Sequence, residues 1–313
     1  MLMFLAKRLA TGVILLASIA TITFFLVFSG TQRVVVNILG QSATDADIAA
    51  LTRKLGIDRP LLTQYADWLS HALRGDLGNA WTMDGSVTDI LGRTLPVTLS
   101  IVAFAIAVMA ILAALLGIAA ATRSGWIDRL IQVLSVIGFS MPNFWLGLLL
   151  IIFFALTLQV LPATGFVSPA SSVTGWLASI TLPAGALILS GVASAAQQVR
   201  GAVLDALRQD YVRTLWARGV SPRSIFFRHA LRNAVPAALT VLSVQFIALL
   251  SGSAVIERIF AIPGLGALTV QSAVVGDIPV LMGIVTSMVA VVVVVNLFID
   301  LLNALANPKV RLS

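Results

Sequence analysis

Six apolar runs, separated by polar segments, constrain this chain more than any other feature of its sequence. Each run is long enough to cross a membrane as an α-helix, which needs about 20 apolar residues. The runs are continuous and do not alternate between apolar and polar residues, which excludes a transmembrane β-barrel. The sequence therefore predicts an all-α polytopic membrane protein. Its six spans are expected at residues 9–29, 97–121, 130–161, 180–199, 237–256 and 280–302.

The composition agrees with this class, because 59% of the residues are hydrophobic and only 11% are charged. A soluble domain usually carries about 25% charged residues. The chain has no cysteine, which excludes disulfides, thiolate metal sites and cysteine nucleophiles. Its two histidines, His71 and His229, fall in separate regions on opposite sides of the predicted membrane, which argues against a histidine metal site.

The distribution of charge predicts how the chain is oriented. Segments assigned to the cytoplasm carry 13 Lys and Arg against 4 acidic residues, a net charge of +9. External segments carry 7 against 9, a net charge of −2, and the two together give the +7 of the whole chain. The positive-inside rule then places both termini in the cytoplasm, and nucleic-acid binding is not expected. The first span is expected to stay attached, with cleavage near residues 17–20 as the alternative.

A cationic segment, residues 210–236, lies between the fourth and fifth runs. Its first half has no helix breaker and places Val212, Leu215 and Trp216 at helical spacing, with Trp216 expected to be buried. The segment also carries five arginines: Arg213, Arg218, Arg223, Arg228 and Arg232. Arginines between membrane spans also follow from the positive-inside rule alone, so this simpler explanation stays open for each of them.

A turn is predicted in the middle of this segment. Gly219 falls where a left-handed C-terminal cap would lie. Ser221 and Pro222 follow as the N-cap and first residue of a second helix. The sequence predicts two short helices bent about Gly219, and we call residues 210–236 the elbow. A rigid, cationic elbow of this kind offers a surface to which another protein can bind.

The elbow resembles the EAA loop of bacterial ABC importer permeases, in the form carried by dipeptide, oligopeptide and nickel permeases. The matching residues are Asp210-Tyr211-Val212-Arg213-Thr214, Ala217-Arg218-Gly219 and His229-Ala230-Leu231-Arg232-Asn233-Ala234. The chain departs from the general motif at Arg213-Thr214-Leu215, where the motif has Glu-Ala-Ala, and at Arg232, where it has proline.

Shorter strings elsewhere resemble the same permeases. They are Leu55-Gly56-Ile57-Asp58-Arg59-Pro60, Leu73-Arg74-Gly75-Asp76-Leu77-Gly78, the Ser-x-Pro-x-Phe-Trp-Leu-Gly string at residues 140–147, Pro263-Gly264-Leu265-Gly266 and Asn307-Pro308-Lys309-Val310-Arg311. The resemblance therefore covers essentially the whole chain. It implies a first transmembrane helix at residues 1–30, an external segment at 31–95, an importer transmembrane domain at 96–305 with its coupling loop at 200–235, and a cytoplasmic tail at 306–313.

The external segment is the only long polar stretch. Leu62, Tyr65, Leu69 and Leu73 fall at helical spacing there and predict a small amphipathic helix. Pro96 is expected at the first helical position of the second span. The segment is read either as a surface that touches a delivery protein or as a solvated loop.

The resemblance implies the type I importer permease fold, with six transmembrane helices and a cytoplasmic coupling helix. It also implies a complex in the bacterial inner membrane. The partners would be a second homologous permease, two cytoplasmic ABC ATPases, an external substrate-binding protein and the lipid bilayer. Carried over by position, the motif places the ATPase contact at Tyr211, Arg213, Thr214, Ala217, Arg218 and Gly219, with His229 and Asn233 supporting it from behind. Gln245 could face the translocation path or serve as interhelical glue, worth about 1 kcal/mol.

The source of energy is expected to lie outside this chain. The sequence contains no G-x-x-x-x-G-K-[ST] loop, so no ATP hydrolysis and no cofactor are expected here, with ATP and Mg bound by the partner ATPases. No acidic residue lies in the middle of a predicted span, as a proton- or sodium-driven carrier would usually need. The predicted function is a permease subunit for di- or oligopeptides. Import of nickel, glutathione or an opine by the same mechanism is the alternative, and a stand-alone carrier or channel is the competing class.

Overall fold

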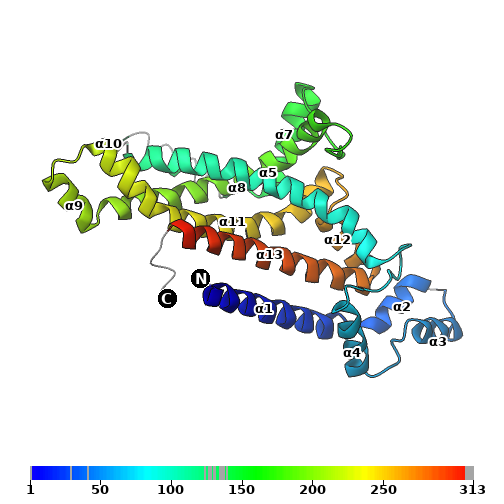
Figure 1. Cartoon of the computed structure of the whole chain (residues 1–313). Helices are drawn as coiled ribbons and strands as arrows, with labels where there is room; N and C mark the ends of the chain where they lie inside the picture. Colours follow the sequence, from blue (N-terminus) through cyan, green and yellow to red (C-terminus); the bar gives the residue numbers. More distant parts are fainter. Residues whose placement is uncertain are drawn as a thin grey trace. The chain divides into compact units, whose positions relative to one another are not determined.

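A computed structural model describes residues 2–28, 30–40, 42–122, 125, 129, 132–133, 138 and 140–306 (Figure 1). Within these residues the chain is helical, and its one extended pairing is an isolated bridge between Asn79 and Ser86. The elements are α1 (Leu2–Phe28), α2 (Thr31–Leu39), α3 (Asp45–Lys54), α4 (Leu61–Ala72), α5 (Val87–Thr122), α7 (Asn143–Leu150), the π-helix η1 (Ile151–Thr157), α8 (Val173–Leu207), α9 (Asp210–Ala217), α10 (Pro222–Ser224), the π-helix η2 (Ile225–Ala230), α11 (Leu231–Ile259), α12 (Leu265–Val275) and α13 (Ile278–Ala306).

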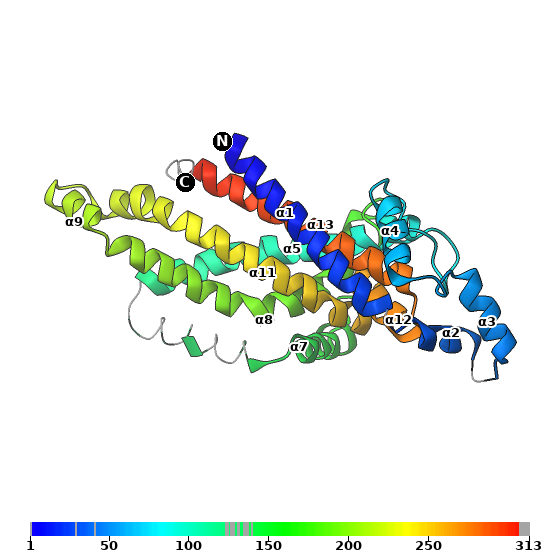
Figure 2. The ribbon, with the colours of Figure 1, turned by 90° about the horizontal axis from the view of Figure 1, so that it is seen from below.

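The helices form two units. Unit 1 contains Leu99–Ile262 and the chain from Val295 onward, and unit 2 contains Leu2–Thr98 and Pro263–Val294. In unit 1, α8 and α11 lie side by side in both views, and α9 lies at the end of this pair (Figures 1 and 2). The buried face of α8 is rich in small residues: Ala184, Ala186, Ala193, Ala195 and Ala196. Small side chains let membrane helices approach closely and gain van der Waals contacts. These contacts matter because the hydrophobic effect does not drive helices together within lipid.

Unit 2 has two apolar clusters. One joins the first turns of α5 to α12 and α13, through Val87, Leu91, Leu265, Leu268, Val280 and Ile284. The other surrounds the fully buried Phe24 of α1, whose ring stacks on Phe28 at 4.0 Å and meets Tyr65 of α4 edge-on at 5.2 Å. The Tyr65 hydroxyl also shares a hydrogen bond with Thr21 Oγ1 at 2.7 Å. These contacts fix α4 against the first span.

Asp277 anchors the loop that precedes α5. Its buried Oδ2 accepts from the backbone N–H groups of Trp81 and Thr82, at 3.0 and 2.8 Å, and from Thr82 Oγ1 at 2.7 Å. A carboxylate with several donors is a strong local anchor because charge-assisted hydrogen bonds exceed neutral ones in strength. The loop therefore depends on a residue almost 200 positions away in the sequence.

Replacing Asp277 by alanine should loosen this loop. The change leaves two backbone N–H groups without their acceptor, which typically costs about 1–3 kcal/mol. We expect amide hydrogen exchange at Trp81 and Thr82 to accelerate by about tenfold or more. Asp84→Ala is the matched control, because Asp84 is an exposed acid of the same loop. Equal exchange in the two variants would contradict the anchoring role.

Five described helices are long and apolar enough to cross a membrane: Ala6–Phe28, Val87–Thr122, Val173–Leu207, Pro222–Ile259 and Ile278–Leu305. They overlap the first, second, fourth, fifth and sixth predicted spans. The third, residues 130–161, lies partly outside the described residues. After Pro142, the described chain forms a shorter apolar helix, Asn143–Thr157. The described helices are thus consistent with the predicted six spans.

Several predicted boundaries are wrong. α5 begins at Val87 and Pro96 lies inside it, because Ser86 caps the helix by accepting from Asp89 N at 3.1 Å. α8 begins at Val173, before the predicted 180, since Ser172 accepts from Gly175 N in the same way. The amphipathic helix predicted within residues 62–73 is confirmed as α4.

Candidate functional site

The turn at Gly219 has the geometry that the sequence predicts. Gly219 has φ +73°, its N–H donates to Trp216 O at 2.9 Å, and Val220 N donates to Leu215 O at 3.1 Å. This pair of bonds is a Schellman motif, which ends a helix with a left-handed residue. A Cβ added at Gly219 would meet nothing within 4 Å. The requirement for glycine is therefore conformational and does not arise from crowding.

The chain resumes helical structure immediately after the turn. Ser221 has extended φ and ψ, its Oγ accepts from Ser224 N, and Pro222 occupies the first helical position, as predicted. The prediction of a second short helix is wrong, however. Helical structure continues from Pro222 to Ile259 through α10, η2 and α11, so the far side of the elbow is the beginning of the fifth span. The turn is thereby attached directly to a long helix that can transmit its movement.

One face of the elbow is packed. Val212 of α9 is 3% exposed and Ile225 of η2 is 1% exposed. Ala230 is also buried, and the Tyr211 hydroxyl donates to Ala206 O in the last turn of α8 at 3.3 Å. These contacts fix the position of α9 relative to α8 and η2.

The other face is exposed. It carries Arg213, Thr214, Ala217, Arg218 and Gly219, five of the six residues predicted to contact an ATPase, whereas Tyr211 is half-buried. All five arginines of the elbow are exposed as well. Arg213 lies 3.8 Å from Asp210 in a solvent-exposed ion pair, which contributes little to stability. The exposed face is therefore cationic and available for contact.

The expectation that Trp216 is buried is wrong, because this residue is 53% exposed. It lies on the same helical face as Arg213 and Ala217, three and one residues away. Phe227, which the sequence analysis did not single out, is 67% exposed on η2. An exposed tryptophan beside arginines is the composition typical of residues that dominate protein interfaces. Residue spacing did not indicate this exposure, because Trp216 lies four residues after the buried Val212.

His229 and Asn233 lie beyond the turn, on η2 and α11. His229 is half-buried and Asn233 is exposed. Among the residues that the structure describes, neither side chain makes a hydrogen bond to α9. Their predicted supporting role stays a prediction.

Gln245 lies on α11 and lines a cavity of about 290 Å³ in unit 1. It is 8% exposed, so the middle of the fifth span contains a buried amide. The cavity also contains Ser190, Ser194 and Gln198 of α8, which sequence reasoning missed. Their spacing of four residues within an apolar run was the available signal.

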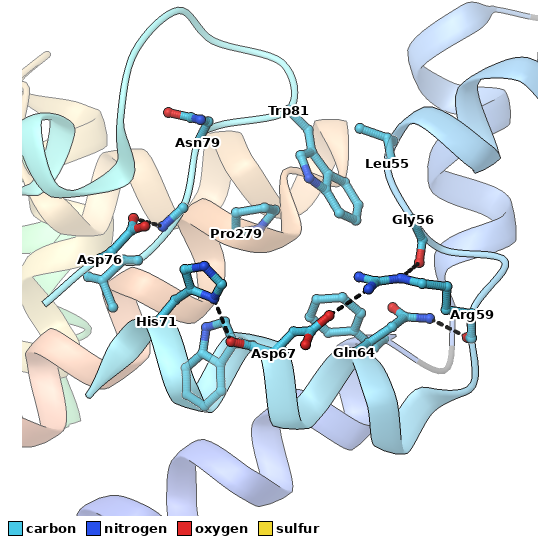
Figure 3. A pocket seen from close by; sticks show the side chains of 14 residues that line it. Leu55, Gly56, Arg59, Gln64, Asp67, His71, Asp76, Asn79, Trp81 and Pro279 are labelled. Carbon is cyan, nitrogen blue, oxygen red and sulfur yellow. Dashed lines mark hydrogen bonds and ion pairs between the residues drawn. The ribbon is translucent and has the colours of Figure 1, made fainter. Parts of the chain in front are cut away.

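A second cavity, of about 310 Å³, lies in unit 2 (Figure 3). Two strings that carry the family resemblance, residues 55–60 and 73–78, both contribute to its lining. Arg59 forms an ion pair with Asp67, and the buried Gln64 donates to Arg59 O at 2.7 Å. The strings therefore meet at one place in the external segment, although α4 separates them in the sequence. Among the described residues no group of acidic and histidine side chains could hold a metal.

These features define a class of protein: a polytopic helical membrane component with an ordered, exposed elbow between two spans. Comparison with known families identifies it further. Residues 113–312 match the model described as binding-protein-dependent transport system inner membrane component, and residues 1–102 match the corresponding N-terminal model. The chain belongs to this family of ABC importer permeases, in the branch represented by dipeptide permeases, and has the type I importer permease fold.

Relatives cover nearly all of the chain. The dipeptide transport system permease protein DppB of Bacillus subtilis (strain 168) is 39% identical over 259 residues, 82% of this chain and 81% of that one. The di/tripeptide transport system permease protein DppB of Pseudomonas aeruginosa (strain UCBPP-PA14) is 32% identical, with 99% of each chain covered. A chain of Brucella abortus (strain 2308), also named for peptide transport, is 35% identical over 97% of this chain and 98% of that one.

Proposed function

We propose that this chain forms half of the translocation pathway of an ATP-driven importer for di- and oligopeptides. The observation that carries the proposal is the exposed face of α9, which the Schellman turn and the Tyr211 anchor hold in a fixed position. The names of the relatives favour peptides over nickel, glutathione or an opine. The complex would contain a second homologous permease, two ABC ATPases and an external substrate-binding protein.

The proposed mechanism begins at the elbow. An ATPase groove receives α9, with Arg213, Trp216 and Ala217 on the contacting face. ATP and Mg would bind to the ATPases, since the sequence of this chain contains no G-x-x-x-x-G-K-[ST] loop. When the ATPases close, α9 moves and carries with it the last turn of α8 and the continuous helix from Pro222. Rigid helices transmit this movement to the spans, which opens the pathway alternately to each side.

The proposed orientation places the elbow and both termini in the cytoplasm and α4 outside, following the +9 and −2 net charges. Because the chain has no cysteine, a single introduced thiol reports the side on which it lies. We expect Ser70→Cys, on the exposed surface of α4, to react with an impermeant maleimide added to intact cells. We expect Gln209→Cys, exposed at the start of α9, to react only after the membrane is opened. Labelling of both from the same side would contradict this topology.

A further inference from the structure

The cavity beside Gln245 is built from polar groups on three helices of unit 1. Asn143 comes from α7, Ser190, Ser194 and Gln198 come from α8, and Gln245 comes from α11. The three α8 residues are spaced by four, so they follow one another along the same helical face. Polar side chains are costly to bury inside a membrane span. Where several of them gather, they often mark a functional site.

Most of these groups are already hydrogen-bonded within the protein. Ser190 Oγ donates to Leu187 O at 2.9 Å, Gln198 Nε2 donates to Ser194 Oγ at 3.3 Å, and Asn143 Nδ2 donates to Gly252 O at 3.4 Å. These bonds hold the lining in place. They also leave the side-chain oxygens of the lining able to accept further hydrogen bonds.

Gln245 is different. The residue is 8% exposed, and no hydrogen bond joins its amide to another of the described residues. Its amide atoms are not among the fully buried unpaired atoms of the described residues, so they keep access to the space of the cavity that the residue lines. Polar groups inside a protein usually have a hydrogen-bond partner, so an amide that faces a cavity without one is available to a group that enters. A role in linking two helices does not explain the position of Gln245, because no hydrogen bond joins its amide to α8. A group that enters the cavity would complete its hydrogen bonding.

Gly191 keeps the cavity open next to this amide. A Cβ at position 191 would lie 3.3 Å from Gln245 Oε1 and 2.7 Å from the terminal methyl of Met109. The glycine therefore leaves space where any other residue would press against the amide. The cavity volume of about 290 Å³ lies near the lower end of small-molecule sites, which begin at about 300 Å³. This is enough for a short peptide segment and too little for a folded partner.

The lining has no charged side chain. A charged group of the solute would lose its water there without gaining a counter-ion. A neutral amide, which offers one donor and one acceptor, matches side-chain amides and hydroxyls that do the same. The chemistry therefore fits backbone amides and does not fit the charged termini or side chains of a solute.

Resting on the proposed peptide function, we propose that this cavity is a recognition site for backbone amides of the passing solute, with Gln245 as the principal contact. The site selects for a peptide bond and is indifferent to the side chain beside it. It lies within the permease and is separate from the selection made by the binding protein.

The test compares two probes in vesicles that contain the complete importer and its binding protein. Trialanine is one probe. The other is alanyl-lactyl-alanine, which has the same charges and nearly the same shape but replaces one amide N–H by an ester oxygen. The measured quantity is the ratio of their initial uptake rates. Selection by the binding protein is the same for every permease variant, so a change in this ratio reports on the permease.

Gln245→Leu should lower trialanine uptake by about fivefold, the effect of one buried hydrogen bond, and should change ester uptake less, so the ratio falls. Thr240→Val is the matched control, since Thr240 is an exposed residue of α11 outside the cavity and should leave both rates unchanged. Intact stimulation of the ATPases by loaded binding protein would establish that the Leu variant is folded and coupled.

Two results would overturn the proposal. An unchanged ratio with unchanged rates would show that Gln245 does not contact the solute. An equal fall in the uptake of both probes would show a structural role in helix packing. Failure of the unaltered importer to take up either probe is a different outcome, because it would refute the proposed peptide function and the amide site with it.

Discussion

Gly219→Val is expected to reduce uptake strongly while leaving the spans folded and inserted. Gly219 has φ +73°, and a residue with a β-carbon loses about 1–2 kcal/mol in this conformation, a branched one more. The Schellman bonds of Val220 and Gly219 would break, so α9 would extend or tilt at its C-terminal end. Because docking depends on shape at close range, we expect uptake by the reconstituted complex to fall by about tenfold or more.

Gly219→Asn separates backbone conformation from side-chain size. Asparagine adopts the left-handed conformation more readily than other non-glycine residues, and nothing lies within 4 Å of a Cβ at this position. This variant should therefore retain most of the uptake.

Arg213→Ala should also lower uptake only slightly, since the ion pair of Arg213 with Asp210 is exposed to solvent. Normal uptake by Gly219→Val would show that the elbow is only a loop between spans.

Gly117→Ala is expected to destabilise unit 1 strongly for so small a change. The added methyl would lie 2.7 Å from the carbonyl oxygen of Ala196 and 2.8 Å from Val199 Cβ, both on α8. A backbone oxygen cannot rotate away, so α5 and α8 would have to separate, and overpacking of this kind typically costs about 1–3 kcal/mol. We expect a lower midpoint of thermal unfolding in detergent.

Gly92→Ala is the matched control for this change, because it is the same substitution in the same helix. A Cβ at Gly92 would meet nothing within 4 Å, and alanine favours a helix over glycine by up to about 1 kcal/mol. Its unfolding midpoint should stay constant or rise. Equal midpoints for the two variants would contradict the close approach of α5 and α8.

The sequence predicted the elements whose causes are local. The end of α9 depends on Gly219, and the restart depends on Ser221 and Pro222, so both could be recognised in a few consecutive residues. The start of α5 was placed too late, because Pro96 was preferred to the capping serine that lies ten residues before it. Pro96 was chosen as the start of the second span, whereas Ser86 provides the actual cap. A proline near the beginning of a long helix is tolerated when the remaining helix is well stabilised.

What depends on three-dimensional packing could not be predicted. Trp216 was assigned to the interior because it falls at helical spacing with Val212 and Leu215, but its side chain is 53% exposed. The convergence of Asn143, Ser190 and Gln245 on one cavity requires three helices to be placed together. No pattern within a single helix contains that information. The anchoring of Trp81 by Asp277 has the same origin.

The central claim is that this chain transports only as part of an ATP-driven complex. Its most direct test is uptake of radiolabelled dialanine into vesicles, with this chain alone or with the second permease, the two ATPases and the binding protein. We expect uptake only by the complete complex, dependent on ATP and lost when this chain is omitted, and no ATP hydrolysis by the chain alone. Uptake by this chain alone, driven by a proton or sodium gradient without ATP, would contradict it and identify a secondary carrier.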